Sequence, residues 1–520
     1  MSSQRSGTGS PGESHDAADR YDGAVSVRAM PRWYVTLFAT DALERFGFYG
    51  MQAILVLYAA APRSTGGLGL ARADAAALFG AWIGLMFILS MAGGWAGDRL
   101  LGQRPALLAG CVFSGIGYLL LAIPTGVMTA VGLCVLAIGG GLFKPNHQAM
   151  INLMFGGSRG RESGISLMYV GVQVSALLAP LVTAFLGERV SWHLAFSVAA
   201  VAVIATGVVF ASTGAQFHGV GARPARPLTP GERRVLLTRT SATGAVLAGL
   251  LVVMALAGVL SPTTAIAITG VLTVIVPPVG YLVLYRNPEL GVTDRRRLRA
   301  FLAVLLGSTL FWMIIAHAAS LLNLFARDHV DLDVAGFTVP AGWLQAVTPM
   351  FILVLAPMIA SVLPRIGGQR HVAIKFATGL LLVGGGFLVM SVAAALAAGD
   401  TRISPLWLIV VYLTHACGEV VVAAVSISAL ADVLPRPFMG RVVGVYWLFA
   451  ALGGGLGSGV VRLSEVVPET AYYLGLGLVA VLVGLGFLLR RAALSRALAT
   501  DDHVDATVGG PGPLASSTEV

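Results

Sequence analysis

The sequence contains few charged residues and very few cysteines. Asp, Glu, Lys and Arg make up 11% of its 520 residues, whereas 56% are hydrophobic and 65 are glycine. A soluble globular domain carries about 25% charged residues, so this composition excludes that class and indicates a membrane protein with many spans. Cys111, Cys134 and Cys417 all lie in apolar runs and predict no disulfide framework.

Motifs for catalysis and for ATP use are also missing. The chain has no GxxxxGK loop, no HExxH sequence and no cluster of Cys or His with the spacing of metal ligands. Pumping driven by ATP and metal chemistry therefore lack support, and we expect neither an enzyme nor a metal or organic cofactor. Segments 1–32 and 491–520 are polar and have the composition of disordered tails.

The net charge of +9 reflects where the basic residues lie along the chain. Arg45 and Lys144 lie inside apolar runs, and most of the other Lys and Arg residues fall on one predicted side of the membrane. The exceptions on the opposite side are Arg63, Arg72, Arg189, Arg327, Arg402 and Arg462. The positive-inside rule then places both termini in the cytoplasm. The charge marks topology, and no nucleic-acid partner is expected.

Apolar runs of spanning length recur along the whole chain. They are predicted to be transmembrane helices near 33–61, 74–96, 105–124, 128–152, 164–187, 190–212, 235–259, 263–285, 299–325, 340–363, 372–397, 404–432, 440–463 and 470–490. Runs of this length suffice to cross the hydrocarbon core of a bilayer as helices. The sequence therefore predicts an all-α membrane protein with fourteen transmembrane helices.

Two short echoes in the sequence indicate related halves. "GDRLLGQR" (97–104) is echoed by "RIGGQR" (365–370), and "GRESG" (160–164) by "GRVVG" (440–444), as is common in transporters. We therefore predict a six, two, six arrangement. It consists of a cytoplasmic tail at 1–32, a six-helix bundle at 33–212, loops and two linker helices at 213–298, a second six-helix bundle at 299–490 and a cytoplasmic tail at 491–520.

Charged residues occur inside the apolar runs, above all in "DALERFGFYG" (41–50). Asp41, Glu44, Arg45 and Phe48 follow one another at i, i+3, i+4 and i+7, so they share one stripe of a helix. A charge at the bilayer centre costs roughly 2.5–3.5 kcal/mol, so such residues pair or face water. Lys144 needs a carboxylate, and Glu44 or Asp41 is the expected partner. A structural salt-bridge cluster is the alternative to a transport site.

The second half contributes a buried carboxylate of its own. Glu419 follows His415 by four residues and therefore shares its helical face. We interpret His415 as a structural residue that orients Glu419 or bonds to a backbone carbonyl. Together with the charges of the first half, Glu419 predicts a site near the middle of the membrane, where transporters built from two repeats bind their substrates.

Several stretches resemble known transporter families. "GGWAGDRLLGQR" (93–104) resembles the loop motif of the major facilitator superfamily. "DALERFGFYGMQAILVLY" (41–58) and "GLFKPNHQAMI" (141–151) resemble the E-x-x-E-R-F-x-Y-Y-G and G-x-x-K-P-N segments of the proton-dependent oligopeptide transporter family. The stretches 320–357 and 403–421 match further parts of that family. The resemblance implies the major facilitator fold and proton-coupled import of short peptides across the plasma membrane.

The resemblance also implies roles for particular residues. Substrate binding is expected to involve Arg45, Tyr49, Phe87, Lys144, Gln173, Trp343, Glu419, Tyr446 and Trp447. Proton coupling is expected to involve Asp41, Glu44, Arg45, Lys144, His317 and Glu419. A cytoplasmic latch between the halves is expected to involve Asp98, Arg99, Arg104, Arg161 and Arg441. In this scheme Arg45 and Lys144 hold the substrate carboxylate, Glu419 receives the ammonium group, and Glu44 with Asp41 behind it exchanges the proton.

The chain departs from the family pattern at pocket positions. Asp41 stands for the first glutamate of the first motif, Phe48 for its first tyrosine, and Gln173 for an asparagine. In "FWMIIAH" (311–317), Ala316 and His317 stand where the family has a glutamate and a glutamine. A histidine titrates near neutral pH, so His317 is a candidate replacement for the glutamate. The alternative is a histidine that only bonds a neighbouring helix.

These features predict a proton-coupled symporter that imports di- or tripeptides or peptide-like solutes by alternating access. We expect a monomer in the plasma membrane, with the proton as its coupling ion. One alternative is a family-like carrier for another zwitterion, or an exporter of a drug or secondary metabolite. The others are a membrane acyltransferase that uses His317 or His415, and a transceptor or purely structural membrane protein.

Overall fold

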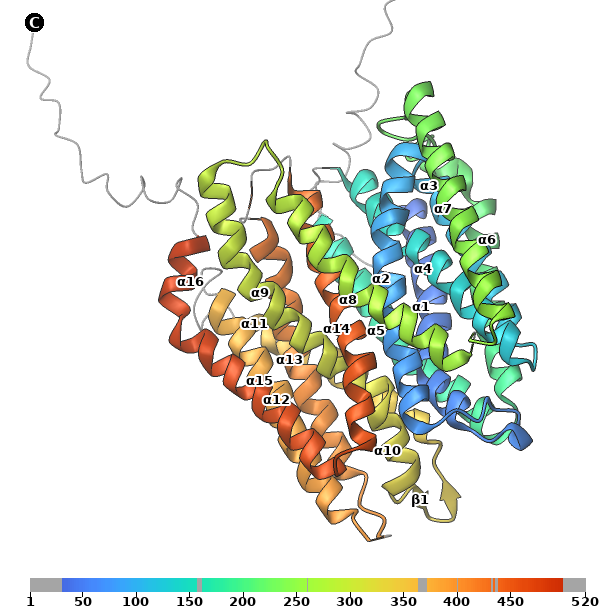
Figure 1. The fold of residues 1–520 in the computed structure, drawn as a ribbon, viewed down its shortest axis with the longest axis vertical. Coiled ribbons are helices and arrows are strands. Elements are labelled where there is room, and N and C mark those ends of the chain that lie inside the picture. The colour runs from blue at the N-terminus through green and yellow to red at the C-terminus, as the bar shows by residue number, and fades with distance from the viewer. Residues whose placement is uncertain are drawn as a thin grey trace, which may run out of the picture.

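The computed structural model describes residues 30–156, 161–259, 261–362, 372–399, 401–431, 434 and 438–498. Within these residues the chain is almost entirely helical, as Figure 1 shows. The first helices are α1 (Arg32–Ala60), α2 (Arg72–Ala96), α3 (Gln103–Leu121), α4 (Gly126–Phe155), α5 (Arg161–Arg189) and α6 (Trp192–Ser212). Prolines bracket α1, with Pro31 at its N-cap and Pro62 just beyond its end, because proline lacks the N–H that continues a helix.

The remaining elements follow in chain order. They are α7 (Pro230–Leu256), α8 (Pro262–Tyr285), α9 (Val292–Ala316), α10 (Leu321–His329), α11 (Val347–Val362), α12 (Val372–Leu396), α13 (Leu406–Ala431), α14 (Met439–Val460), α15 (Glu469–Leu489) and α16 (Arg491–Leu498). A short antiparallel hairpin, β1 (Asp333–Val334) and β2 (Phe337–Thr338), pairs Asp333 with Thr338. Figure 1 shows it beside α10, at one end of the helix bundle.

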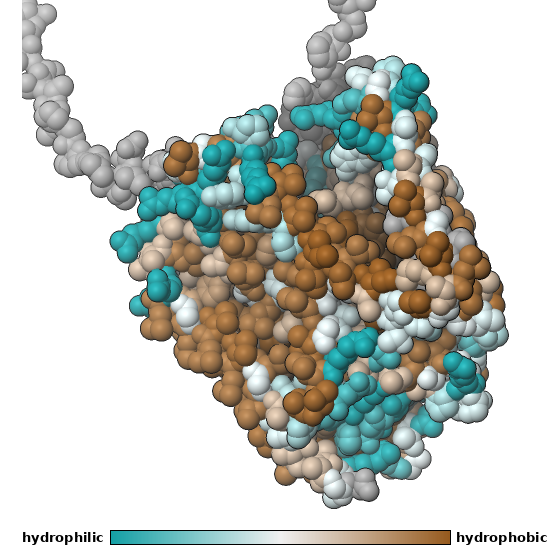
Figure 2. All heavy atoms as spheres, in the orientation of Figure 1, coloured by the Kyte–Doolittle hydropathy of each residue, from teal (hydrophilic) through white to brown (hydrophobic). Residues whose placement is uncertain are grey.

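The predicted class of an all-helical membrane protein is confirmed. Eleven helical stretches in the described residues are long and apolar enough to cross a membrane. Figure 2 shows a broad hydrophobic band on the visible face, with hydrophilic residues gathered toward two opposite ends. α1 is not among the eleven stretches, because Asp41, Glu44 and Arg45 lower its hydropathy.

Contacts sort the helices into two groups. In the first group α3 packs on α4, α2 on α4, and α1 on α5 and α6; in the second, α12 packs on α13 and α15, and α9 on α14. α8 contacts both α2 and α14 and therefore lies between the groups (Figure 1). α7 lies at the edge of the first group, and most of its described side chains are exposed.

One predicted span is interrupted in the structure. The run 299–325 predicted a single helix, but α9 ends before a short 3₁₀ segment, His317–Ala319, and α10 follows it. Asn323 Nδ2 of α10 donates a hydrogen bond to the Ala53 carbonyl of α1 at 2.7 Å. The apolar run in the sequence is unbroken here, so it does not reveal the break.

The two groups are tied together at the end that carries Arg63, Arg72 and Arg189, which we name the outer end. Arg462 Nη2 of the second group lies 3.0 Å from Asp74 Oδ1 of α2. The Glu188 carboxylate at the end of α5 accepts hydrogen bonds of 2.9 Å from the N–H groups of Ala341 and Gly342, which precede α11. These contacts cross from one group to the other, so they hold the groups together at this end.

Candidate transport site

The charged stripe of α1 is buried and contains an ion pair between neighbours. Arg45 is 2% exposed and Glu44 is 4% exposed. Arg45 Nε donates to Glu44 Oε2 at 2.6 Å, and the guanidinium lies over the Phe48 ring, 4.5 Å from its centroid. Burial of both ions is tolerated because each neutralises the other in a poorly solvated position. The predicted sharing of one face by Glu44, Arg45 and Phe48 is consistent with these contacts.

Lys144 of α4 lies among charges from other helices. Its ammonium group interacts electrostatically with Arg45, Asp41 and Glu44 of α1 and with Glu419 of α13. Its side chain is exposed, although the residues of α4 on either side of it are mostly apolar. No ion pair within 4.0 Å joins Lys144 to Glu44 or Asp41 among the described residues, so the expected direct partner is not formed in this conformation.

The bend of α4 at Pro145 is held by α2. Pro145 has no N–H to bond to the Gly141 carbonyl, which loosens the helix beside Lys144. Asn146 Nδ2 donates to the Gly93 carbonyl of α2 at 2.9 Å. A Cβ at Gly93 would lie 2.1 Å from the Gly141 carbonyl oxygen, so only glycine permits this approach. The Lys-Pro-Asn sequence therefore fixes where the lysine emerges from the helix.

Glu419 of α13 brings a charge of the second group to the same place. It interacts electrostatically with Lys144 of α4 and with Tyr49 of α1. The Glu419 side chain is partly exposed. Glu419 belongs to the second helix group, whereas α1 and α4 belong to the first. Charges from both groups therefore interact with one another, and the assignment of these residues to a substrate site stays a prediction.

A titratable residue that the sequence analysis did not single out lies next to this cluster. His147 of α4 is one turn after Lys144, and its Nδ1 lies 3.9 Å from Asp41 Oδ1 of α1. Its Nε2 is 2.9 Å from the Leu37 carbonyl, and its ring stacks on Phe143. The signal in the sequence is its spacing of three residues from Lys144, which places both on one face of α4.

The predicted aromatic residues form two separate sets. Phe87 of α2 stacks on Trp447 of α14 with ring centroids 5.6 Å apart, and Trp312 Nε1 of α9 donates to Tyr446 Oη at 3.4 Å. These rings line the contact between the two groups. Trp343 lies elsewhere, because its Nε1 donates to the Leu181 carbonyl of α5 at 2.9 Å near the outer end. Gln173 of α5 is buried and bonds to the side chain of Tyr169.

His317 and His415 lie inside the second group. His317 Nδ1 donates to the Met313 carbonyl at 2.8 Å, and Nε2 accepts from the Tyr472 hydroxyl at 2.7 Å. No recorded contact joins His317 to Arg45 or Lys144 in the described residues, so its part in coupling stays a prediction. Neither ring nitrogen of His415 has a hydrogen-bond partner in the described structure, so it does not orient Glu419 by such a bond.

The residues predicted to form a cytoplasmic latch each have a partner that does not belong to the opposite helix group. Asp98 accepts from Gln103 Nε2 (2.7 Å), Arg99 pairs with Glu232 at the start of α7 (3.1 Å), Arg161 donates to Asn152 (2.9 Å), Arg104 lies over the Phe217 ring (5.6 Å) and Arg441 lies 4.0 Å from Glu289. Hydrogen bonds from Thr229 lower the pKa of the Glu232 carboxyl, which favours its ion pair. None of these five contacts joins the first group to the second, so the latch between the halves stays a prediction.

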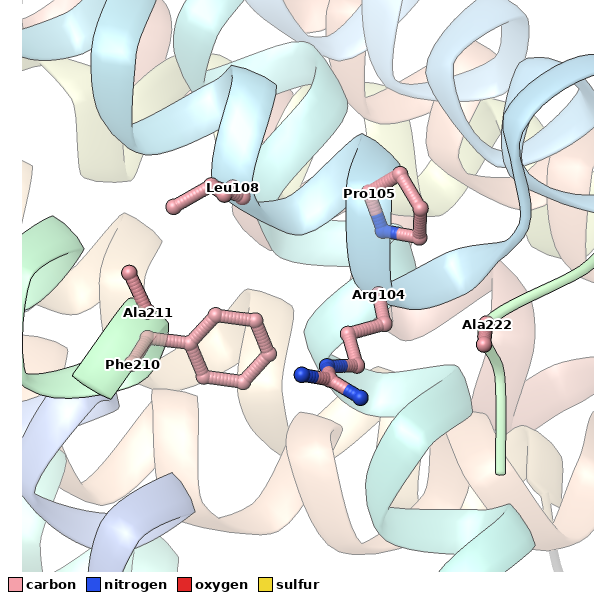
Figure 3. Close-up of a pocket in the computed structure, with 6 residues that line it drawn as sticks. All are labelled: Arg104, Pro105, Leu108, Phe210, Ala211 and Ala222. Carbon is pink, nitrogen blue, oxygen red and sulfur yellow. The ribbon is translucent and has the colours of Figure 1, made fainter. Parts of the chain in front are cut away.

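A pocket of about 250 Å³ lies beside Arg104, away from the charged cluster. Figure 3 shows the Arg104 side chain pointing into the space between Phe210 and Ala222. The other lining residues are Pro105, Leu108 and Ala211. The lining belongs to α3, the end of α6 and the loop after it, and includes no residue of the predicted transport site.

Comparisons with known proteins assign the chain to a family. Residues 105–476 match the model of the POT family. The chain is 29% identical over 477 residues to the uncharacterized transporter YclF of Bacillus subtilis (strain 168), covering 90% of this chain and 95% of the relative. It is 27% identical over 471 residues to the di-/tripeptide transporter of Lactococcus lactis subsp. cremoris, covering 88% and 95%.

A solved structure agrees with these matches. The crystal structure of the peptide transporter POT in complex with sulfate is 31% identical, covers 93% of this chain and 99% of that chain, and superposes with a TM-score of 0.88. The resemblance noted in the sequence is therefore confirmed, and the chain belongs to the POT family of transporters.

Proposed function

We propose that the protein is a proton-coupled symporter that imports di- or tripeptides or peptide-like solutes. The observation that carries this proposal is the meeting of Lys144 and Arg45 from the first group with Glu419 from the second. A short peptide is a zwitterion, and this arrangement offers cations at one end and a carboxylate at the other. Membership in the POT family and the relative named a di-/tripeptide transporter support the same function.

The binding mode follows from the charges. Arg45 and Lys144 hold the peptide carboxylate, with two parallel hydrogen bonds available only from the guanidinium. Glu419 receives the peptide ammonium group. Because Lys144 and Glu419 lie on different groups, a bound zwitterion links the two halves by its own charges. The aromatic rings of Tyr49, Phe87, Tyr446 and Trp447, together with Gln173, complete the site as walls, whereas Trp343 is bonded to the Leu181 carbonyl near the outer end.

Proton coupling follows from competition for Arg45. Glu44 is bound to Arg45 in this conformation. When a substrate carboxylate takes over Arg45, Glu44 loses its counter-charge in a buried position and binds a proton instead. Asp41, Lys144 and Glu419 are the other groups that we assign to coupling, with His317 as the alternative that His317→Gln tests. The membrane potential adds about 2.3 kcal/mol per 100 mV for each charge that moves inward.

Alternating access is consistent with the contacts between the groups. The polar ties at the outer end, such as Glu188 with Ala341 and Gly342, close that side in this conformation. On the inner side, Asp98, Arg99, Arg104, Arg161 and Arg441 form the latch when the halves rock to the opposite state. Transporters of this type open one end while the other is held shut around a fixed site.

The architecture that we propose includes the observed helices together with the further spans predicted from the sequence. It has fourteen transmembrane helices in a six, two, six order, with bundles at 33–212 and 299–490, a linker region at 213–298, and cytoplasmic tails at 1–32 and 491–520. Eleven spans, two contact groups and α8 between them support it. We place both termini in the cytoplasm and the protein in the plasma membrane as a monomer that acts as a carrier and not as an enzyme.

Uptake into liposomes tests the proposed function. The purified full chain is reconstituted, an inward proton gradient is imposed, and accumulation of labelled dialanine is followed with and without a proton carrier such as an uncoupler. We expect accumulation above the external concentration that collapses with the uncoupler. No accumulation of dialanine, together with gradient-driven transport of another solute, would overturn the peptide assignment.

A second candidate rests on the altered pocket. Phe48 and Ala316 replace a tyrosine and a glutamate of the family pattern, which removes two polar groups next to the charged cluster. These changes favour a carrier for a different zwitterion or an exported metabolite. A thermal-shift screen of the purified protein against peptides and metabolites separates the two, because a ligand that binds the folded state raises its apparent stability.

A further inference from the structure

His147 is placed with one ring nitrogen fixed and the other facing a carboxylate. Nε2 lies 2.9 Å from the Leu37 carbonyl oxygen, and Nδ1 lies 3.9 Å from Asp41 Oδ1. The His147 side chain is 4% exposed, so it has little water to turn to, whereas the Asp41 side chain is 18% exposed. The stacking of Phe143 on the imidazole, with centroids 5.3 Å apart and planes 11° apart, holds the ring in this orientation.

The chemistry of these contacts decides where the imidazole carries its hydrogens. A carbonyl oxygen only accepts hydrogen bonds, so Nε2 carries an N–H toward Leu37. In the neutral ring Nδ1 is then an acceptor, and it faces the oxygen of an ionised carboxylate, which is also an acceptor. Two acceptors in a buried position gain nothing from each other. One proton between Asp41 and His147 turns this contact into an attractive one.

The surrounding groups leave this pair as a separate unit. On the elements packed against α4, the charged and titratable groups include Tyr34, Glu44, Arg45 and Tyr49 of α1, Asp98 and Arg99 beyond α2, Arg104, Cys111 and Tyr118 of α3, and Arg161 and Tyr169 of α5, with Lys144 on α4 itself. Among the described residues, Asp41 is the group with a recorded ionic contact to His147. Glu44 is engaged by Arg45, so the two carboxylates of α1 have different partners.

We propose that Asp41 and His147 share one exchangeable proton and form a proton-binding site beside the charged transport site. With the proton bound, the pair is an imidazolium next to a carboxylate, and its net charge is zero. Without the proton, the pair has a net charge of −1. The partly exposed Asp41 side chain gives the proton a way to water.

The Asp41–His147 pair supplies a titratable site in the first helix group, whereas the second helix group has Ala316 in place of the family's glutamate. If the proposed proton-coupled transport holds, this is where a coupling proton binds on α1 and α4. α1 also carries the Glu44–Arg45 pair. Binding and release of the proton therefore act on the helix that carries Arg45, the cation proposed to bind the substrate carboxylate. A shift of about 1 Å between α1 and α4 is enough to convert the 3.9 Å contact into a direct hydrogen bond.

The first test reads the proton directly and needs no substrate. The full chain is labelled with ¹⁵N at its histidines, and His147→Gln identifies the resonances of His147 among the nine histidines. We expect an Nε2–H tautomer in the neutral ring and, at mildly acidic pH, an imidazolium fraction that falls severalfold in Asp41→Asn. A His147 that stays neutral down to pH 5, or whose imidazolium fraction is the same in Asp41→Asn, would overturn the shared proton.

The second test separates coupling from transport as such. Liposomes with His147→Gln are compared with wild type in two assays, dialanine accumulation driven by an inward proton gradient and dialanine exchange at equal pH on both sides. We expect exchange to persist, while accumulation stops at equal concentrations inside and outside. Accumulation like that of wild type would overturn the role in coupling. Loss of exchange as well, in both His147→Gln and Asp41→Asn, would assign the pair to positioning and would also overturn it.

A matched control removes another histidine that contacts a backbone carbonyl. His193 Nδ1 lies 3.4 Å from the Leu121 carbonyl, and no carboxylate faces it in the described residues. His193→Gln is expected to accumulate dialanine like wild type and to leave the His147 resonances unchanged. Failure of the wild-type protein to accumulate dialanine would contradict the proposed function. The resonances of His147 would still show whether Asp41 and His147 share a proton.

Discussion

Two buried histidines, one in each helix group, show how the halves differ. His147 in the first group and His317 in the second each donate a hydrogen bond to a backbone carbonyl, of Leu37 and of Met313. The second nitrogen of His317 accepts from the Tyr472 hydroxyl, so its neutral ring is fully satisfied. The second nitrogen of His147 faces the carboxylate of Asp41. The contacts of His317 fit a neutral imidazole, and the contacts of His147 fit an imidazole that binds a second proton.

The same difference extends to the charged residues around the transport site. The first group contributes Asp41, Glu44, Arg45 and Lys144 from α1 and α4. The second contributes Glu419, and its Ala316 replaces the glutamate of the family pattern. Titratable and charged groups of the candidate site are therefore concentrated in one half, while the other half contributes one carboxylate. The following changes break or sharpen this asymmetry, beginning with the largest expected effect.

Arg45→Ala removes the cation that compensates Glu44 in the charged half. Glu44 is 4% exposed, so its charge is left buried without a partner, which costs about 3–5 kcal/mol of folding free energy. We expect loss of gradient-driven uptake and a clear fall in Tm, measured by liposome uptake and by thermal unfolding in detergent.

Two further variants control for Arg45→Ala. Arg45→Lys keeps the charge without the planar fork and should regain stability but little uptake. Arg63→Ala removes an exposed arginine near the outer end and should leave both properties unchanged. Uptake in Arg45→Ala at the wild-type level would show that the stripe of α1 is a structural salt bridge only.

Glu419→Gln tests the single carboxylate that the second half gives to the site. Losing a charge-assisted hydrogen bond costs about 1.5–3 kcal/mol, which corresponds to a rise in KM for dialanine of roughly ten- to a hundredfold. The fold itself should tolerate the change because the side chain is partly exposed. Glu465→Gln, at an exposed glutamate after α14, is the matched control. A KM that does not move would mean that Glu419 does not hold the ammonium group.

Ala316→Glu gives the second half a titratable group and so reduces the asymmetry. Ala316 is partly exposed at the end of α9, next to the 3₁₀ segment that follows. We expect the number of protons moved per dialanine to rise by up to about one, because a new buried carboxyl binds a proton when it loses contact with water. The stoichiometry is measured from the membrane potential at which net uptake reverses. An unchanged value would argue that α9 is not on the proton path.

Much of the fold was predictable because it depends on local hydropathy. Runs of apolar residues between arginine-rich turns predicted helices close to those observed, for example 372–397 against α12 and 470–490 against α15. The break at His317–Ala319 was not predictable, since the apolar run 299–325 continues through it without an interruption. Spacing along one helix says nothing about contacts with other helices.

The sequence indicated which charged residues interact with one another, but not which of them form pairs. The cost of charge in a membrane singled out Glu44, Arg45, Lys144 and Glu419, which the structure brings together. Glu44 bonds to Arg45, although neighbours in a helix do not usually face each other, so the sequence favoured Lys144 as its partner instead. His147 was missed because its spacing of three residues from Lys144 is a weak signal, whereas its contact with Asp41 is seen in the structure alone.

His317→Gln tests the neutral side of the comparison and has the smallest expected effect. Glutamine retains an N–H for the Met313 carbonyl, but it fits the Tyr472 hydroxyl less well, so we expect a loss of about 1 kcal/mol in folding free energy. Uptake of dialanine and its dependence on pH should stay close to those of wild type, because the neutral ring carries no exchangeable proton. Thermal unfolding and uptake between pH 5 and pH 8 measure the two. A flattened pH dependence in His317→Gln would place a coupling histidine in the second half after all, and the asymmetry between His147 and His317 would then disappear.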